Sequence, residues 1–266
     1  MSKINNVVLN AFIATLGTWF ITMLGAATVV FFKKPNQKFL NLMLGFAAGV
    51  MIAASFWSLL QPAIESAELY LIVPPWLVTT VGFICGAVFI WISDKIVRRK
   101  QRDTEETNYK FNRVVMLILS ITLHNIPEGL AVGVAFGALH GSNFSIEGFM
   151  GAVTIAVGIG LQNFPEGAAV SLPLRREGYS RRKSFLLGQA SGMVEPFAGV
   201  IGSLAVVYIR EALPFALSFA AGTMILVAVH ELIPECQSNN KAHPYFATMG
   251  IISGFAVMML LDVMLG

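Results

Sequence analysis

Long apolar segments recur along this chain and restrict its fold more than any other feature. Eight can be drawn, near residues 7–32, 39–62, 73–97, 112–139, 147–174, 184–209, 213–235 and 244–265. About twenty apolar residues in a helix cross the roughly 30 Å hydrocarbon core of a bilayer, where every backbone polar group must be bonded within the protein. We therefore expect an all-α polytopic membrane protein with eight transmembrane helices.

The composition supports one membrane domain and excludes a soluble one. Hydrophobic residues make up 56% of the chain and charged residues only 12%, whereas soluble proteins carry about 25% charged residues. The first apolar segment is too long for the apolar region of a signal peptide, so we expect it to be a membrane helix. Connections are short apart from the charged segment 98–111. The sequence thus predicts a single transporter-sized domain over 1–266 that has the lipid bilayer as its surroundings.

The basic residues predict the orientation of the chain. The loops that follow the first, third, fifth and seventh spans hold 16 of the 18 Lys and Arg residues, and Lys3 and Arg210 lie on the other side. By the positive-inside rule these four loops are cytoplasmic and both termini lie outside. The net charge of +3 then reflects membrane topology, and nucleic-acid binding is not expected.

Two internal similarities predict an inverted repeat. The heptapeptide that begins at Phe46 in the second span returns, with one substitution, at Phe219 in the seventh, and the motif around Glu128 returns 38 residues later around Glu166. The members of each pair cross the membrane in opposite directions. We therefore expect a 3+2+3 arrangement in which the first three and last three spans are related around the fourth and fifth, as in many transporters.

The repeated motif places polar groups inside two apolar spans. It reads His124-Asn125-Ile126-Pro127-Glu128-Gly129 in the fourth span and Gln162-Asn163-Phe164-Pro165-Glu166-Gly167 in the fifth. Residues three and four apart share one face of a helix, so each glutamate lies beside the two polar residues that precede it. Each proline removes a backbone hydrogen bond and should kink its helix, and the following glycine should let another helix approach closely.

The depth of the carboxylates indicates a metal site. At about 1.5 Å per residue, Glu128, Glu166 and Glu195 lie roughly 22, 14 and 18 Å from the basic residues on the inner side, which is near the middle of the membrane. Three carboxylates at one depth repel each other unless they are protonated or bridged by cations. Imidazole, amide and carboxylate groups together suit Zn²⁺, Fe²⁺ or Mn²⁺.

Three further side chains are weaker candidates. Met51 lies at a similar depth and could add a thioether ligand, although simple packing is the preferred explanation. His230 and Glu231, in the inner half of the seventh span, could form an exit site, and a solvated helix end is the alternative. Asp94, at the inner end of the third span, is expected to be a solvated cap.

The paired motifs, with the Glu-Pro at residue 195 and the His-Glu at residue 230, resemble the ZIP (Zrt-/Irt-like) family of divalent metal transporters, in particular its bacterial GufA-like branch. The resemblance covers essentially the whole chain and implies a two-metal centre, elevator-like alternating access, a homodimer and a place in the bacterial plasma (inner) membrane. It assigns the first metal to His124, Glu128, Gln162 and Glu166, and the second to Asn125, Glu128, Asn163 and Glu166. Glu195 would bridge the two ions, Met51 would lie near the first, and His230 and Glu231 would line the exit.

This chain departs from the family pattern at two ligand positions. Residue 162 is Gln where many relatives have His, and residue 163 is Asn where others have Asp or His. An amide is a neutral and weaker ligand, so we expect the two halves of the site to bind metal unequally.

These observations predict a transporter that moves a divalent transition metal into the cytoplasm, with zinc first and iron, manganese and cadmium as further candidates. The metal is the substrate, and no organic cofactor is expected. A metal-gated channel or a proton-coupled exporter on the same fold is the alternative. An enzyme is not expected, because an intramembrane metalloprotease requires HExxH and Pro234 follows His230 where the second histidine should be.

Overall fold

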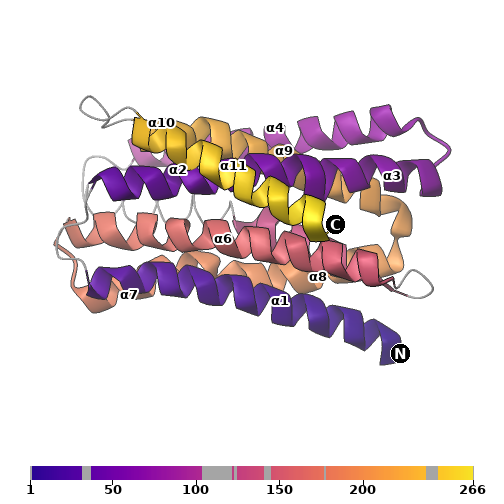
Figure 1. Cartoon of the computed structure of the whole chain (residues 1–266), viewed down its shortest axis with the longest axis horizontal. Coiled ribbons are helices and arrows are strands. Elements are labelled where there is room, and N and C mark those ends of the chain that lie inside the picture. Colours follow the sequence, from indigo (N-terminus) through magenta and orange to yellow (C-terminus); the bar gives the residue numbers. More distant parts are fainter. Residues whose placement is uncertain are drawn as a thin grey trace.

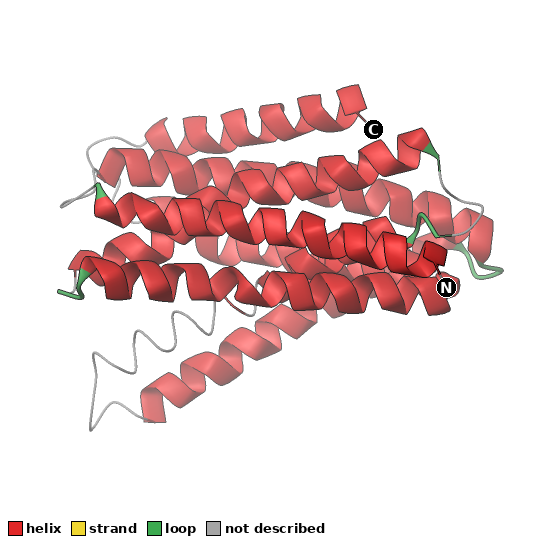
Figure 2. Ribbon diagram, turned by 90° about the horizontal axis from the view of Figure 1, so that it is seen from below, coloured by secondary structure: helices red, strands yellow, loops and turns green. Residues whose placement is uncertain are grey.

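The computed structural model describes residues 2–31, 37–103, 122, 125–140, 145–176, 178–237 and 245–265. These residues form helices joined by short turns, with no β-strand in the described ranges, and most of the helices lie side by side along one common direction (Figure 2). The predicted all-α polytopic architecture is therefore confirmed.

The helices follow the order in Figure 1, with several rods built from more than one element. α1 (Ser2–Ala27) ends in a 3₁₀ turn, and α2 (Gln37–Ala54), a π-helix (Ser55–Leu60) and α3 (Gln61–Tyr70) form the next rod. α4 (Pro75–Asp103) is followed by helical residues 125–137 and by α6 (Ile146–Arg176). α7 (Arg181–Ala190) and α8 (Val194–Tyr208) share one rod, as do α9 (Leu213–Val227), a second π-helix (Ala228–Leu232) and α10 (Ile233–Gln237). α11 (Tyr245–Leu265) ends the described chain.

Six of these rods are long and apolar enough to cross a membrane. They cover Asn6–Val30, Lys38–Tyr70, Pro75–Ile96, Arg181–Tyr208, Arg210–Gln237 and Tyr245–Met264. The predicted fifth span is α6, whose 31 residues reach about 46 Å and whose apolar run the polar motif interrupts. The predicted fourth span is described only from Asn125 onward, and its first half lies outside the described residues.

The rods divide into two groups. α1 packs against α6, α7 and α8, and residues 125–137 pack against α8 through their glycines; we call these helices the motif group. α2 packs against α11, and α4 and α3 pack against α9; we call these helices the flanking group. The groups meet mainly where α2 and α11 contact α6. Both carriers of the repeated motif therefore belong to the same group.

Close helix contacts repeat in the way that the inverted repeat requires. A Cβ atom on Gly254 of α11 would lie 2.0 Å from the carbonyl oxygen of Phe46, and one on Gly86 of α4 would lie 2.0 Å from that of Phe219. Phe46 and Phe219 begin the matching heptapeptides. The pairs α2–α11 and α4–α9 are thus equivalent contacts, in which the third helix of each half packs on the second helix of the other.

The π-helices and two partly buried aspartates follow the same symmetry. The π-helices begin at Ser55 and Ala228, which are separated by 173 residues, as Phe46 and Phe219 are. Each π-helix contacts an aspartate on a neighbouring rod. Ser58 donates a hydrogen bond of 2.5 Å to Asp262 of α11, and His230 lies 3.6 Å from Asp94 of α4. Because α4 and α11 run in opposite directions (Figure 1), the two contacts lie toward opposite ends of the molecule.

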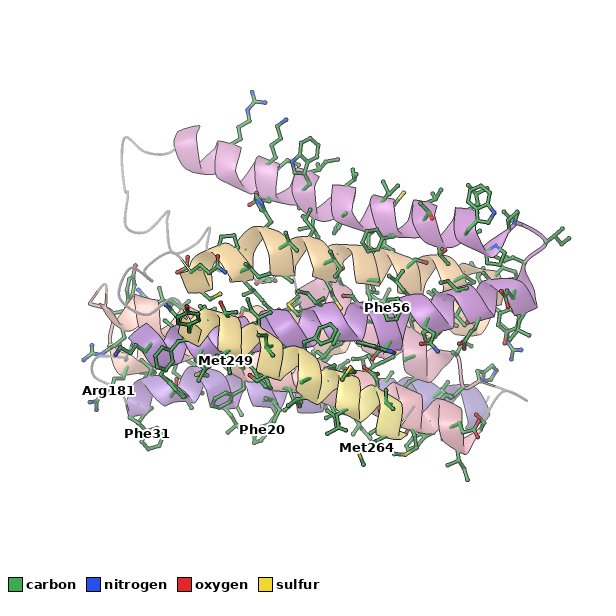
Figure 3. All side chains as sticks on the ribbon, turned by 45° about the horizontal axis from the view of Figure 1, so that its top comes forward. Phe20, Phe31, Phe56, Arg181, Met249 and Met264 are labelled. Atoms are coloured by element: carbon green, nitrogen blue, oxygen red, sulfur yellow. The ribbon has the colours of Figure 1, made fainter. Side chains whose placement is uncertain are left out.

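The outer faces of the bundle are apolar. Large hydrophobic side chains point outward along α1, α2 and α11, among them Phe20, Phe31, Phe56, Met249 and Met264 (Figure 3). Only 22% of the residues in the most apolar stretch of α11 are buried, against 72% for the corresponding stretch of the α2–α3 rod. An apolar surface of this extent requires a lipid environment or a partner protein, which fits a polytopic membrane protein.

Candidate metal centre

The two copies of the motif meet inside the motif group. Asn125 and Glu128 lie on the first turns of residues 125–137, and Gln162, Asn163 and Glu166 lie halfway along α6. Asn125, Glu128, Gln162 and Asn163 are at most 1% exposed, and Glu166 is 8% exposed. His124 lies outside the described residues, so its part in the site stays a prediction from the sequence.

One hydrogen bond joins the two copies directly. Gln162 Nε2 donates to Glu128 Oε1 at 2.7 Å. The other oxygen of Glu128 and the amide oxygen of Gln162 are buried and have no hydrogen-bond partner among the described residues, and the same holds for Asn125 Oδ1 and Asn163 Oδ1. A buried polar atom without a partner costs about 1–3 kcal/mol. Four such oxygens from two helices require an explanation, and a bound cation or water supplies one.

The carboxylates of the site act on each other. Glu128 is close enough to Glu166 and Glu195 for their negative charges to repel it. Low effective dielectric inside the protein strengthens this repulsion. A divalent cation between the two motif helices would relieve it, which is the chemistry predicted from the depth of these residues.

Glu195 faces a different set of groups. It lies at the start of α8, is fully buried, and accepts hydrogen bonds from Asn163 Nδ2 at 2.9 Å to each carboxylate oxygen. The hydroxyl of Thr18 on α1 also donates to it, and the hydroxyl of Thr22 lies 3.5 Å away. Among the described residues, no group of three His, Cys, Asp or Glu side chains is arranged to hold one ion. Glu195 is turned toward α1 and Asn163.

The glycine after each glutamate brings a further helix to the site, as predicted. A Cβ atom on Gly129 would lie 2.5 Å from the carbonyl oxygen of Glu195, and one on Gly167 would lie 2.1 Å from that of Thr22. Both distances are too short for any side chain, so only glycine permits these approaches. The two glycines therefore position α8 and α1, which carry the groups around Glu195.

The prolines of the motif do not end the described helices. α6 continues as one helix through Pro165 to Arg176. Since proline has no N–H group, the carbonyl of Leu161 loses its helical hydrogen bond. This places a backbone oxygen without its helical partner one turn before Pro165, beside Gln162.

The three weaker candidates have separate surroundings. Met51 is 1% exposed and belongs to the main apolar core of the bundle. His230 and Glu231 lie in the second π-helix, and π-helical turns are frequent at functional sites. His230 is half exposed and pairs with Asp94, whose side chain is only 11% exposed. The expectation that Asp94 is a solvated cap was therefore wrong, because α4 packs against the rod that carries His230.

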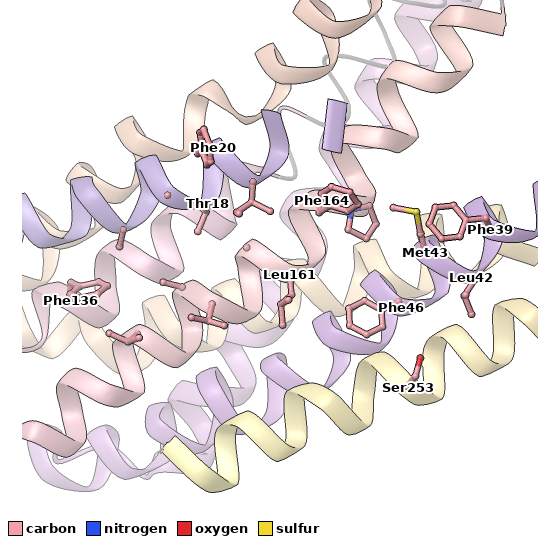
Figure 4. A pocket seen from close by; sticks show the side chains of 18 residues that line it. Thr18, Phe20, Phe39, Leu42, Met43, Phe46, Phe136, Leu161, Phe164 and Ser253 are labelled. Carbon is pink, nitrogen blue, oxygen red and sulfur yellow. The ribbon is translucent and has the colours of Figure 1, made fainter. Parts of the chain in front are cut away.

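A large apolar cavity borders the motif group. It has a volume of about 960 Å³ and lies between α1 and α6 on one side and α2 and α11 on the other (Figure 4). Among the described residues that line it, the only polar side chains are those of Thr18 and Ser253. The cavity lacks metal ligands, so the candidate site is the polar cluster beside it. It also leaves space between the two helix groups.

Sequence reasoning missed the threonines of α1. Thr15, Thr18 and Thr22 are all buried, at 0%, 3% and 1% exposure, and Thr18 and Thr22 approach Glu195. Their spacing of three and four residues puts them on one face of a helix. Three threonines on one face of an otherwise apolar span could have indicated a polar contact with another helix.

Comparison with known proteins gives a consistent result. Residues 97–262 match the family described as ZIP zinc transporter. Zinc transporter ZIP11 of Xenopus tropicalis is 39% identical over 97% of this chain and 98% of that protein. Zinc transporter ZIPB of Bordetella bronchiseptica is 34% identical over 92% of this chain and 78% of its own length. Zinc transporter GufA of Myxococcus xanthus is 38% identical over 59% of this chain and 58% of that protein.

Proposed function

Because this chain belongs to the ZIP zinc transporter family, we propose that it carries zinc through the membrane by way of the polar cluster between residues 125–137 and α6. Iron, manganese and cadmium are further candidate substrates, since the site offers oxygen ligands together with the imidazole of His124. In this proposal zinc moves toward the cytoplasm of a bacterial cell. The distribution of Lys and Arg predicts the topology, with both termini outside.

The observation that carries this proposal is the set of buried oxygens without partners. They belong to Asn125, Glu128, Gln162 and Asn163, from two helices of the motif group. With the charge of Glu166 nearby, they form a site in which a divalent ion would replace its bound water by protein ligands. Such an exchange is what selective transport through a membrane requires.

The division into two helix groups supports alternating access. All polar groups of the site belong to the motif group, and an apolar cavity separates part of that group from α2 and α11. Mostly apolar side chains line this boundary, so displacement along it breaks few polar contacts. In the proposed mechanism the motif group moves as a unit relative to the flanking group and carries the ion from one side to the other.

The proposed centre has two metal positions that share Glu128 and Glu166. The first position is completed by His124 and Gln162, the second by Asn125 and Asn163, and Glu195 bridges the two. Met51 contributes packing beside the first position and, if it turns inward, a thioether. The second position has a neutral amide where relatives with Asp would supply a charge, so the first is the stronger of the two.

Flux measurements separate this proposal from its alternative. Purified protein in proteoliposomes with zinc outside should give saturable uptake at a rate that is independent of a pH gradient. Uptake that increases linearly with zinc concentration would indicate a metal-gated channel. Zinc movement that requires an opposing proton gradient would indicate a proton-coupled exporter.

The contact between His230 and Asp94 is the proposed exit site. Asp94→Asn keeps the shape of the side chain but removes the charge that faces His230. We expect the maximal rate of zinc uptake to fall about tenfold, because the exit site loses its carboxylate charge, while equilibrium binding at the central site stays at the wild-type level. Ser93→Ala on the same helix is the matched control. A fall in central-site affinity instead of rate would contradict the exit role.

A homodimer is the proposed assembly, with the apolar outer face of α4 as part of its interface. Cys85 is exposed on that helix, and Cys236 is buried. A short bifunctional maleimide reagent added to membranes should therefore link two chains through Cys85, and Cys85→Ser should remove the dimer band while Cys236→Ser keeps it. A band that survives in Cys85→Ser would place the interface elsewhere.

A further inference from the structure

The carboxylate of Glu195 is surrounded by hydrogen-bond donors. Asn163 Nδ2 bonds both of its oxygens at 2.9 Å, and the Thr18 hydroxyl bonds one of them. Thr22 contributes a longer contact of 3.5 Å, and the side chain is fully buried. Hydrogen bonds to an ionised group are about twice as strong as neutral ones. These donors therefore occupy both carboxylate oxygens of Glu195 and offset part of the cost of burying a charge there.

The side-chain amide of Asn163 can donate hydrogen bonds to Glu195 in only one orientation. Its nitrogen must face Glu195, because an amide oxygen in the same place would repel the carboxylate. The nitrogen also donates to the backbone oxygen of Thr18 at 3.2 Å, which fixes the amide from a second side. Its oxygen is buried and has no hydrogen-bond partner among the described residues, so the oxygen is the atom of this side chain that can bind metal. An aspartate at position 163 could not donate to Glu195 at all.

Position 163 therefore differs in kind from position 162. Gln162 bonds Glu128, a residue of the first metal position, and both keep an oxygen without a partner. Asn163 bonds Glu195, the residue that would have to bridge two ions. Four contacts, from Asn163, Thr18 and Thr22, fill the roughly four lone-pair sites of the Glu195 carboxylate, so a metal ion that binds Glu195 must displace at least one of them.

We propose that the Asn163 amide and the Thr18 hydroxyl take the place of a second cation beside Glu195, so that this chain binds one divalent ion tightly and a second only at higher metal concentration. The inference rests on the proposed transport function, and it makes Thr18 a positioning residue of the site. A single ion then occupies the position next to Glu128, Gln162 and Glu166 during transport at low metal concentration. Breaking the bonds to Glu195 sets the affinity for the second ion.

The inference predicts that loss of a donor strengthens metal binding. Thr18→Val keeps the shape of the side chain and removes its hydrogen bond to Glu195. A cation then competes with fewer donors, so we expect the second ion to bind about tenfold more tightly, which corresponds to one hydrogen bond to a charged group. Thr18→Ser keeps the hydroxyl and should behave as wild type. Damage to the fold would weaken binding, so a gain of affinity distinguishes a positioning role from a structural one.

The test is a zinc titration of the purified full-length chain in nanodiscs, by equilibrium dialysis with elemental analysis. Wild type should bind one zinc ion tightly and a second at least about tenfold more weakly, whereas Asn163→Asp, which replaces the donor by a charged ligand, should bind two tightly. Glu128→Ala should remove the tight ion. Cadmium-113 spectra of the same samples should show one signal in wild type and two in Asn163→Asp.

The outcomes separate this inference from the transport function. Two ions of equal affinity in wild type, or a second ion that binds more weakly in Thr18→Val, would overturn the inference and leave the transport site intact. Wild type with one tight ion and an Asn163→Asp variant that also binds only one would overturn it as well. Wild type that binds no zinc would overturn the proposed function, and the inference with it.

Discussion

Glu128→Ala is expected to reduce zinc uptake into proteoliposomes to the level of vesicles without protein. Glu128 is a ligand of both proposed metal positions, and it bonds Gln162 across the two motif helices. Its removal deletes a charged ligand and also leaves the Gln162 amide nitrogen without that buried partner, which costs about 1–3 kcal/mol. Glu166→Ala should abolish uptake for the first of these reasons.

Two companion variants make this result specific. Glu128→Gln keeps the volume of the side chain and removes its charge, so it should lose uptake while the amount of folded protein in the membrane stays normal. Glu147→Ala removes an exposed carboxylate from the first turn of α6, the helix that carries Glu166, and should transport zinc as wild type does. Unchanged uptake in Glu128→Gln or Glu166→Ala would refute the assignment of the site.

Gly167→Ala is expected to destabilise the motif group and to lower the amount of folded protein that detergent extracts. A Cβ atom there would lie 2.1 Å from the carbonyl oxygen of Thr22 and 2.8 Å from the amide nitrogen of Ala26. Both neighbours are backbone atoms, so α1 as a whole must move away. We expect a loss of about 3 kcal/mol, at the upper end of the usual cost of overpacking. Thermal unfolding in detergent, followed by fluorescence, measures it.

The same helix provides a control for glycine itself. A Cβ atom on Gly151 of α6 would meet nothing within 4 Å. Gly151→Ala should therefore leave the protein at least as stable as wild type, because alanine favours a helix by up to about 1 kcal/mol over glycine. If the two variants unfold at the same temperature, the close contact between α6 and α1 is not needed for stability.

The sequence predicted the membrane helices and the meeting of the two motifs for clear physical reasons. The length of an apolar segment determines whether it spans the membrane, and the number of residues from a span end determines the depth of a side chain in the membrane. The motifs that contain Glu128 and Gln162 could therefore be placed at one depth, and the hydrogen bond between these two residues agrees with that placement. The inverted repeat was predictable because the two halves still share a similar heptapeptide, which begins at Phe46 in one and at Phe219 in the other.

Other features depended on how the helices pack, which spacing does not determine. Thr18 lies 177 residues from Glu195, and nothing in the sequence links a threonine of the first span to a glutamate of the sixth. Asp94 was misread because its partner, His230, comes from another rod. The orientation of the Asn163 amide is set by the carboxylate opposite it, and only a three-dimensional structure supplies that neighbour.

The π-helices at Ser55 and Ala228 set the rotational phase of the two rods that contain them. A π turn holds one residue more than an α-helix accommodates, and the two π-helices lie at equivalent places in the two halves. Deleting one residue from either would rotate the remainder of that rod by about 100°. The deletion would separate Ser58 from Asp262, or His230 from Asp94, so the extra residue in each rod keeps a polar side chain directed at the aspartate of the neighbouring rod.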